Sequence, residues 1–152
     1  MSRGETFPPM QELVPHSGRM RLLGRVLEHT PERTVCSLDP ADSELFQEPD
    51  GSVPGWVGVE YMAQCIAAHG GLVAWNQGEK PQRGLLLGTR WTELHVDAFA
   101  PGRPLQVVSN HLRGDRALVW FDCTIEPAGG GEPLARGRLS VYAMEGEAQH
   151  GP

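Results

Sequence analysis

Cysteine and basic residues are scarce in this sequence, and each shortage excludes a class of protein. Cys36, Cys65 and Cys123 stand apart, with no CxxC motif and no histidine in ligand spacing, so they predict reduced, mostly buried thiols and no metal site. Lysine and arginine number 13 against 19 aspartate and glutamate, which gives a net charge of -6. Without a basic surface, nucleic acid is not an expected partner.

Long apolar runs are also absent. Residues 1–20 contain no signal-like apolar segment, and no segment reaches the roughly 20 uninterrupted apolar residues that a membrane span needs. The longest candidate, residues 53–76, is interrupted by three polar side chains, Glu60, Gln64 and His69. We therefore expect a cytoplasmic protein without a membrane span, and 152 residues fit a single domain.

Residues 53–76 form the most informative stretch, VPGWVGVEYMAQCIAAHGGLVAWN. From Trp56 to Trp75 the side chains are apolar or small on nearly every side, which predicts a buried helix rather than a surface helix with one apolar stripe. Glu60 and Gln64 are spaced by four residues, so they lie on one face of that helix. We expect this face to look into a pocket.

Glu60 has two possible roles in such a helix. It can be fixed by a neighbouring arginine or by backbone donors and serve only the fold, because unpaired glutamate is seldom buried. Alternatively, burial raises its pKa, so that Glu60 holds a proton near neutral pH and donates it to a leaving group. The dipole at the helix N-terminus opposes this rise, since it favours the anion.

The start of the helix offers a second chemical feature. Pro54 and Gly55 break the preceding segment, so the backbone amides of Gly55, Trp56 and Val57 are expected to be free at the helix N-terminus. Free amides at this position can polarise a carbonyl oxygen.

Histidines outside this helix give weaker signals. His16 lies in an irregular loop, LVPHSGRM, between Pro15 and Gly18, and loops carry function more often than their share. His95 and His111 fall in predicted strands. Of the remaining histidines, only His69 on the helix is expected to line a pocket.

The rest of the chain predicts strands. Two strands, within 20–29 and 34–38, precede the helix, and a polar connection, 41–52, leads into it. A meander follows with four further strand regions, 84–96, 104–112, 117–125 and 133–144. The fold class is therefore α+β, with an antiparallel sheet wrapped around one long central helix. The free sheet edge and the remaining helix flank favour a dimer.

Three segments carry a resemblance to a known family: LVPHSGRMRLLGRV (13–26), VPGWVGVEYMAQ (53–64) and GLLLGTRWTELHVDAFAPGRPLQV (84–107). They resemble the hotdog-fold 3-hydroxyacyl-acyl-carrier-protein dehydratases, and PHSGRM, PGWVGVEYMAQCIAA and LLLGTR are most similar to the branch of aryl polyene biosynthesis. The resemblance implies a single hotdog domain, 1–152, with a core at about 13–144 and tails at 1–12 and 145–152.

The resemblance also implies an activity. A 3-hydroxyacyl thioester on the phosphopantetheine of an acyl carrier protein would lose water to give a trans-2-enoyl thioester, without a metal or another cofactor. His16 and Glu60 would be the catalytic pair, and Gly55, Trp56, Val57 and Gln64 would bind substrate. In the resembled enzymes the histidine and the carboxylate come from opposite subunits of a homodimer or heterodimer.

One departure keeps alternatives open. Fatty-acid-type dehydratases carry their histidine in a GHFP loop just before the helix, whereas this chain has QEPDGSVPG there and no histidine between Thr30 and Gly55. Either His16 replaces that histidine, or the chain is a non-catalytic subunit that pairs with an active dehydratase. A third possibility is an acyl thioesterase that uses the helix carboxylate.

Overall fold

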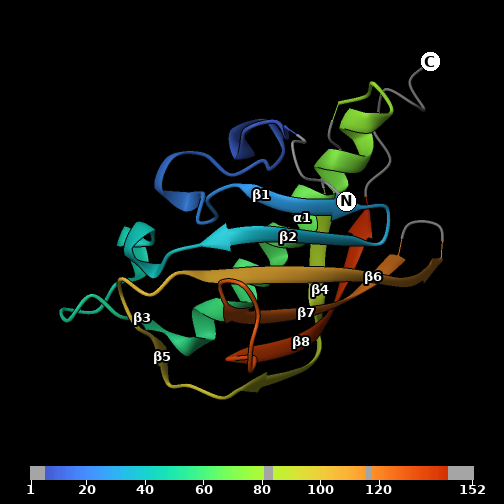
Figure 1. Ribbon diagram of the computed structural model, residues 1–152. Coiled ribbons are helices and arrows are strands. Elements are labelled where there is room, and N and C mark those ends of the chain that lie inside the picture. Colours follow the sequence, from blue (N-terminus) through green and yellow to red (C-terminus); the bar gives the residue numbers. More distant parts are fainter. Residues whose placement is uncertain (1–5, 81–83, 116–117, 144–152) are drawn as a thin grey trace.

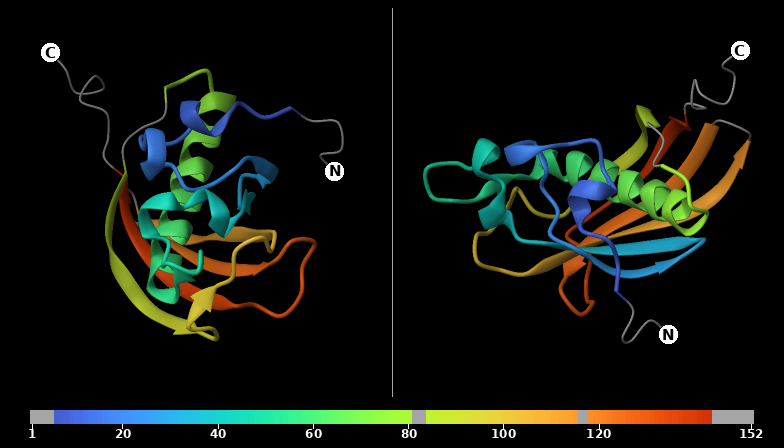
Figure 2. Two further views of the ribbon diagram at one scale, coloured as in Figure 1. Left: turned by 90° about the vertical axis from the view of Figure 1, so that its left-hand side faces the viewer. Right: turned by 90° about the horizontal axis from the view of Figure 1, so that it is seen from above.

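The computed structural model describes residues 6–80, 84–115 and 118–143. One long helix, α1 (Gly58–Asn76), lies against a six-stranded antiparallel sheet (Figure 1). The strands follow the order β1-β2-β6-β7-β8-β4. Their bounds are β1 (Val26–Thr30), β2 (Arg33–Leu38), β4 (Gly84–Leu94), β6 (Leu105–Asp115), β7 (Leu118–Pro127) and β8 (Ala135–Ala143). This confirms the predicted sheet around a central helix, and Figure 2 shows the strands curving around α1.

The helix is buried on most of its surface, as its composition predicts. Tyr61, Met62, Cys65 and Ala68 are 0% exposed, and Leu72 is 1% exposed. All three cysteines are free and buried, in agreement with the sequence interpretation. Among the described residues, no helix is long and apolar enough to cross a membrane.

Two predicted boundaries are wrong. The strand predicted within residues 20–29 begins only at Val26, after a 3-10 turn at Gly18–Met20. The reason is tertiary, because the Leu22 N–H donates to the Gln64 side chain of the helix instead of to a strand. The helix itself begins at Gly58, because Val53–Pro54 form a short strand, β3, that pairs with β5 (Ala98–Phe99).

Part of the predicted N-terminal tail packs against the core. Met10–Glu12 form a 3-10 turn, and Met10 is only 4% exposed within the hydrophobic core. Its apolar side chain, followed by Leu13 at 2% exposure, holds this segment against the helix side of the sheet. Residues 1–5, and the predicted C-terminal tail at 145–152, lie outside the described residues.

Strand β4 forms one end of the sheet. It pairs with β8 from Gly84 to Leu94, and within the described residues no strand pairs with its other side. A long strand with unpaired N–H and C=O groups is a template for pairing with another chain. The expected free edge is therefore present.

Gly71 sets how closely the segment that carries His16 approaches the helix. A Cβ added at Gly71 would lie 2.5 Å from the Leu13 carbonyl oxygen and 2.9 Å from its Cα, so backbone must move. We expect Gly71→Ala to lower the free energy of unfolding by about 1–3 kcal/mol, measured by urea denaturation. Gly70→Ala is the matched control, because its Cβ would meet nothing within 4 Å and alanine favours helix by about 1 kcal/mol. Equal stability of the two variants would contradict this packing.

Candidate active site

His16 and Glu60 meet in one chain. The His16 Nε2 atom lies 3.4 Å from Glu60 Oε2, and their side chains are 24% and 36% exposed. Glu60 comes from the first turn of α1, whereas His16 comes from the irregular segment between two 3-10 turns, Met10–Glu12 and Gly18–Met20. The structure therefore joins the two residues that the sequence analysis singled out. The two side chains meet within a single chain, without a residue from a second subunit.

Gln64 holds this arrangement in place. Its Oε1 accepts a 2.9 Å hydrogen bond from the Leu22 N–H, and its Nε2 donates to the Met20 carbonyl at 2.8 Å. The same Nε2 donates to Glu60 Oε2 at 3.1 Å. Because Gln64 is 0% exposed and its amide is occupied, it positions Glu60 and the His16 segment. A substrate contact through Gln64 stays a prediction.

The ionisation of Glu60 differs from the prediction. Its contact with His16 lowers the pKa of Glu60 below its usual range, and the Gln64 bond acts in the same direction. Partial burial raises the pKa but does not outweigh these contacts. The predicted raised pKa is therefore wrong, because Glu60 gains hydrogen-bond and charge partners as it is buried. In the substrate-free protein Glu60 is a carboxylate at neutral pH.

The second nitrogen of His16 is uncommitted. His16 Nδ1 is buried and has no hydrogen-bond partner among the described residues. A neutral imidazole carries one proton, and an Nε2–H faces the Glu60 carboxylate favourably. That tautomer leaves the Nδ1 lone pair free, which is the arrangement of a base held by a neighbouring carboxylate.

The predicted amides at the helix start are only partly available. The Gly55 N–H donates to the Asp97 carbonyl at 2.8 Å, so the expectation that it is free is wrong. The Gly55 N–H is occupied because the pairing of β3 with β5 brings Asp97 beside Gly55. Val57 is fully buried in the 3-10 turn Gly55–Val57, while Trp56 is 65% exposed and packs edge-on against Phe46. Substrate contacts from Trp56 and Val57 stay predictions.

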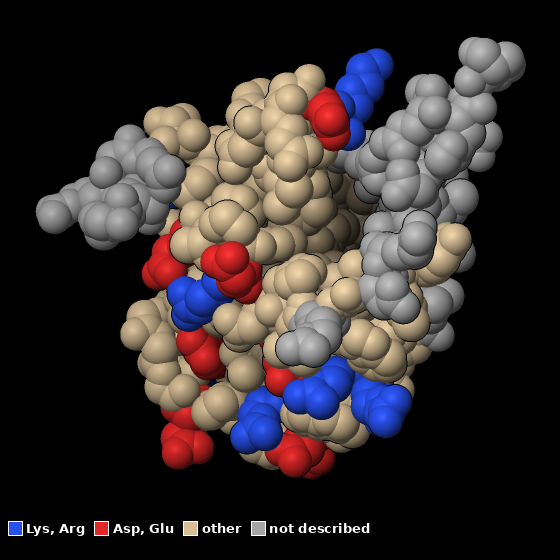
Figure 3. All heavy atoms as spheres, turned by 90° about the vertical axis from the view of Figure 1, so that its right-hand side faces the viewer, with Lys and Arg blue, Asp and Glu red and all other residues tan. Residues whose placement is uncertain are grey.

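A cavity of about 630 Å³ extends from the His16–Glu60 pair along α1. Ala63, Ile66 and Ala67 follow Glu60 in its wall, and Val119 and Val141 line it from β7 and β8. Figure 3 shows a hollow on this side of the molecule whose described border is mostly uncharged, with charged side chains above and below it. The cavity has the apolar lining that suits an acyl chain.

Three aromatic side chains gather farther along this cavity: His69, His111 and Phe121. The rings of His69 and His111 stack with centroids 6.1 Å apart and an interplanar angle of 25°. Phe121 meets both rings in T-shaped geometry, with its ring centroid 5.5 Å from that of His69 and 5.3 Å from that of His111. His69 was expected to line a pocket, but His111 was missed because its place in a strand gave no sign of which face it occupies.

Hydrogen bonds within the chain fix the His69 ring. His69 Nδ1 lies 2.8 Å from the Thr34 hydroxyl, which also lies 2.8 Å from His29 Nδ1. Its other contact is with the Pro31 backbone, and since proline has no N–H, the ring N–H donates to that carbonyl. Burial, and then the neighbouring His29 and His111, lower the pKa of His69 to about 4. His69 is therefore neutral at physiological pH.

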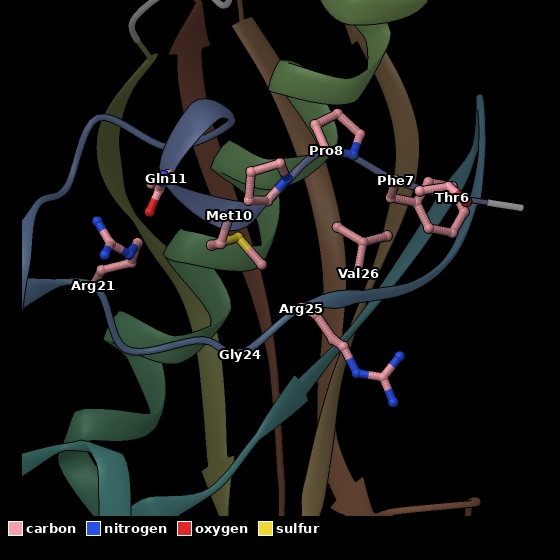
Figure 4. Close-up of a pocket in the computed structure, with 10 residues that line it drawn as sticks. Thr6, Phe7, Pro8, Met10, Gln11, Arg21, Gly24, Arg25 and Val26 are labelled. Carbon is pink, nitrogen blue, oxygen red and sulfur yellow. The ribbon is translucent and has the colours of Figure 1, made fainter.

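A second cavity, of about 490 Å³, lies apart from the pair. It is formed between residues 6–11 and the segment from Arg21 to Val26. Figure 4 shows the Arg25 side chain extending away from the N-terminal segment. Neither His16 nor Glu60 lines this cavity, so it is not the reaction site.

Comparison with known proteins places the chain. Residues 8–150 match the family described as ApeP-like, ApeP dehydratase. The chain belongs to this dehydratase family. It is also similar to a chain of the dehydratase heterocomplex ApeI:P from Xenorhabdus doucetiae, with 28% identity over 95% of this chain and 97% of that one and a TM-score of 0.86. The family match confirms the predicted resemblance and the dehydratase activity.

More distant structures share the fold alone. AziG of S. sahachiroi is 16% identical, with a TM-score of 0.62 over 88% of this chain and 98% of that one. Thioesterase HI1161 of Haemophilus influenzae is 14% identical, with a TM-score of 0.63 over 93% of each chain. These neighbours confirm the hotdog fold. None of the curated proteins compared with this chain matches it.

No metal centre is formed in the part of the chain that the structure describes, where no three His, Cys, Asp or Glu side chains are placed to hold an ion.

Replacing the Gln64 amide tests its positioning role. Gln64→Met keeps the length but leaves the Leu22 N–H and the Met20 carbonyl without their partner. We expect a loss of about 2 kcal/mol in the free energy of unfolding, and a roughly 10- to 100-fold lower kcat as His16 and Glu60 shift. Gln106→Met is the control, since in the described part of the chain the Gln106 side chain bonds to Glu126 and Gly129, away from the cavity. Unchanged kcat in Gln64→Met would contradict the positioning role.

The neutral His69 predicts how stability depends on pH. Its folded pKa is about 4 against an ordinary 6.5, so the unfolded chain binds the proton first as pH falls. Between pH 6.5 and pH 4 the protein should lose up to about 3 kcal/mol of unfolding free energy through this group. Chemical denaturation across this range should show a smaller slope in His69→Gln and the wild-type slope in His95→Gln. An unchanged slope in His69→Gln would show that another group causes the loss.

Proposed function

We propose that this chain removes water from a 3-hydroxyacyl thioester to give a trans-2-enoyl thioester in aryl polyene biosynthesis, with His16 and Glu60 as the reacting pair. The observation that carries this proposal is the 3.4 Å contact between the two side chains at one end of an apolar cavity. An imidazole beside a carboxylate can take a proton from carbon and deliver a proton to a leaving hydroxyl near neutral pH.

The proton takes a closed route in this mechanism. His16 takes the proton from C2 of the substrate, the electron pair forms the C2=C3 bond, and the C3–O bond breaks. The proton passes from His16 to Glu60 across their contact and onto the departing hydroxyl, which leaves as water. The pair then returns to a neutral imidazole and a carboxylate, which agrees with the lowered pKa of Glu60. The reaction is an elimination without net oxidation, so it requires no redox cofactor.

The thioester carbonyl needs a donor while its oxygen gains negative charge. We assign this role to the backbone at Trp56 and Val57, one turn before Glu60, where the positive end of the helix dipole lies. Gly55 is left out because its N–H already bonds to Asp97.

Two partners belong to the proposal. An acidic acyl carrier protein would deliver the substrate on phosphopantetheine, and Arg21 offers a positive charge between Met20 and Leu22, the two residues whose backbone bonds to Gln64. A second hotdog dehydratase chain, or a second copy of this chain, would pair with the free edge of β4. Similarity to a chain of the ApeI:P heterocomplex supports pairing with a second hotdog dehydratase chain.

Substituting the pair tests the mechanism. Glu60→Gln and His16→Ala should each lower kcat/KM for a 3-hydroxyacyl thioester roughly 10²- to 10⁴-fold, measured by enoyl formation. The chain offers a matched control in His95 and Glu93, a second histidine–glutamate contact of 3.3 Å that does not line the cavity. Glu93→Gln and His95→Ala should keep full activity.

The product distinguishes the remaining alternatives. Release of free thiol without an enoyl product would indicate a thioesterase. Full dehydratase activity of a heterodimer that contains Glu60→Gln and His16→Ala together would indicate a non-catalytic subunit.

Because Glu60 acts as a carboxylate, its deprotonation should cause no loss of kcat/KM between pH 6 and pH 9.

A further inference from the structure

The proposed substrate cavity changes character along its length. Near His16 and Glu60 its wall continues through small and aliphatic side chains, Ala63, Ile66 and Ala67. At the level of His69 it becomes aromatic. Nine residues separate Glu60 from His69, which is roughly 14 Å along the helix axis. A group that packs on the aromatic rings is therefore several carbon atoms away from the reacting C2 and C3.

The rings in this region are arranged as packing surfaces. The ring nitrogens of His69 are already bonded to Thr34 and the Pro31 carbonyl, so His69 presents its carbon atoms and ring surface. His111 stacks on it nearly in parallel, and Phe121 closes the group edge-on. A ligand that enters here meets ring faces and edges.

We propose that His69, His111 and Phe121, the aromatic cluster, are specificity-determining residues that accept a planar aryl group at the far end of the acyl chain. This inference rests on the proposed function and extends that function by naming the residues that select the substrate. Flat rings pack on one another in offset-stacked or edge-on geometry and gain more than their buried area alone provides. A saturated alkyl end of the same length lacks this gain.

His111 is the best position for a test. It is exposed in this chain, whereas Phe121 is 5% exposed and His69 is 3% exposed, so a change at His111 should leave the fold intact. His111→Leu removes the ring, and His111→Phe keeps a ring while removing the nitrogens. His95→Leu is the control, because His95 is an exposed histidine that does not line the cavity.

The experiment measures binding without turnover. Pantetheine analogues in which an amide replaces the thioester would carry an aryl-ended chain, an alkyl-ended chain of equal length, or a four-carbon chain too short to reach the cluster. Isothermal titration of the full-length protein should show tighter binding of the aryl-ended analogue. His111→Leu should weaken that binding roughly three- to tenfold and change the other two less than twofold. His111→Phe and His95→Leu should keep the preference.

Several results would overturn the assignment. One is that His111→Leu weakens the binding of all three analogues equally. Another is that His111→Phe weakens binding of the aryl-ended analogue as much as His111→Leu does. A third is that the unmodified protein binds the aryl-ended analogue no more tightly than the alkyl-ended one, or binds neither. The amide analogues are not turned over, so failure of the dehydration proposal would appear separately, as missing enoyl product while the aryl preference persists.

Discussion

Gln64 bonds at once to backbone on both sides of Arg21 and to the carboxylate of Glu60, and the candidate site depends on these bonds. An amide has a donor end and an acceptor end, so it can satisfy a carbonyl and an N–H of one passing segment together. In doing so it fixes the depth at which the His16 segment crosses the helix. No other residue type of this length offers both functions without charge.

The same contacts decide the electrostatics of the site. Burial alone would favour a protonated Glu60, but a buried carboxylate that gains an imidazole and an amide donor becomes easier to ionise. The structure thus places an ionised Glu60 beside the His16 ring. His69 shows the opposite case, because its ring is buried with neutral partners and other histidines, and it stays uncharged.

Sequence patterns predicted the features that depend on local spacing. The apolar helix, the shared face of Glu60 and Gln64 and the antiparallel sheet all follow from periodicity that neighbouring residues impose. What failed depended on contacts between distant segments. The ionisation of Glu60 required knowing that His16 lies beside it, and the start of the first strand required knowing that Leu22 bonds to Gln64. His111 was missed because strand position alone does not reveal a neighbour on the helix.

The separation along the chain between Gln64 and its partners has a consequence for folding. Met20 and Leu22 lie 44 and 42 residues away from Gln64 in sequence, and Leu13 reaches Gly71 across an even longer interval. Such distant contacts form late, since the loops they close cost entropy before they gain energy. The same holds for β2 and β6, whose paired residues lie even farther apart in sequence, so docking of the N-terminal segment belongs to the late steps together with closure of the sheet. Because Met10 and Leu13 belong to the hydrophobic core, a chain whose N-terminal segment is undocked lacks part of that core as well as His16.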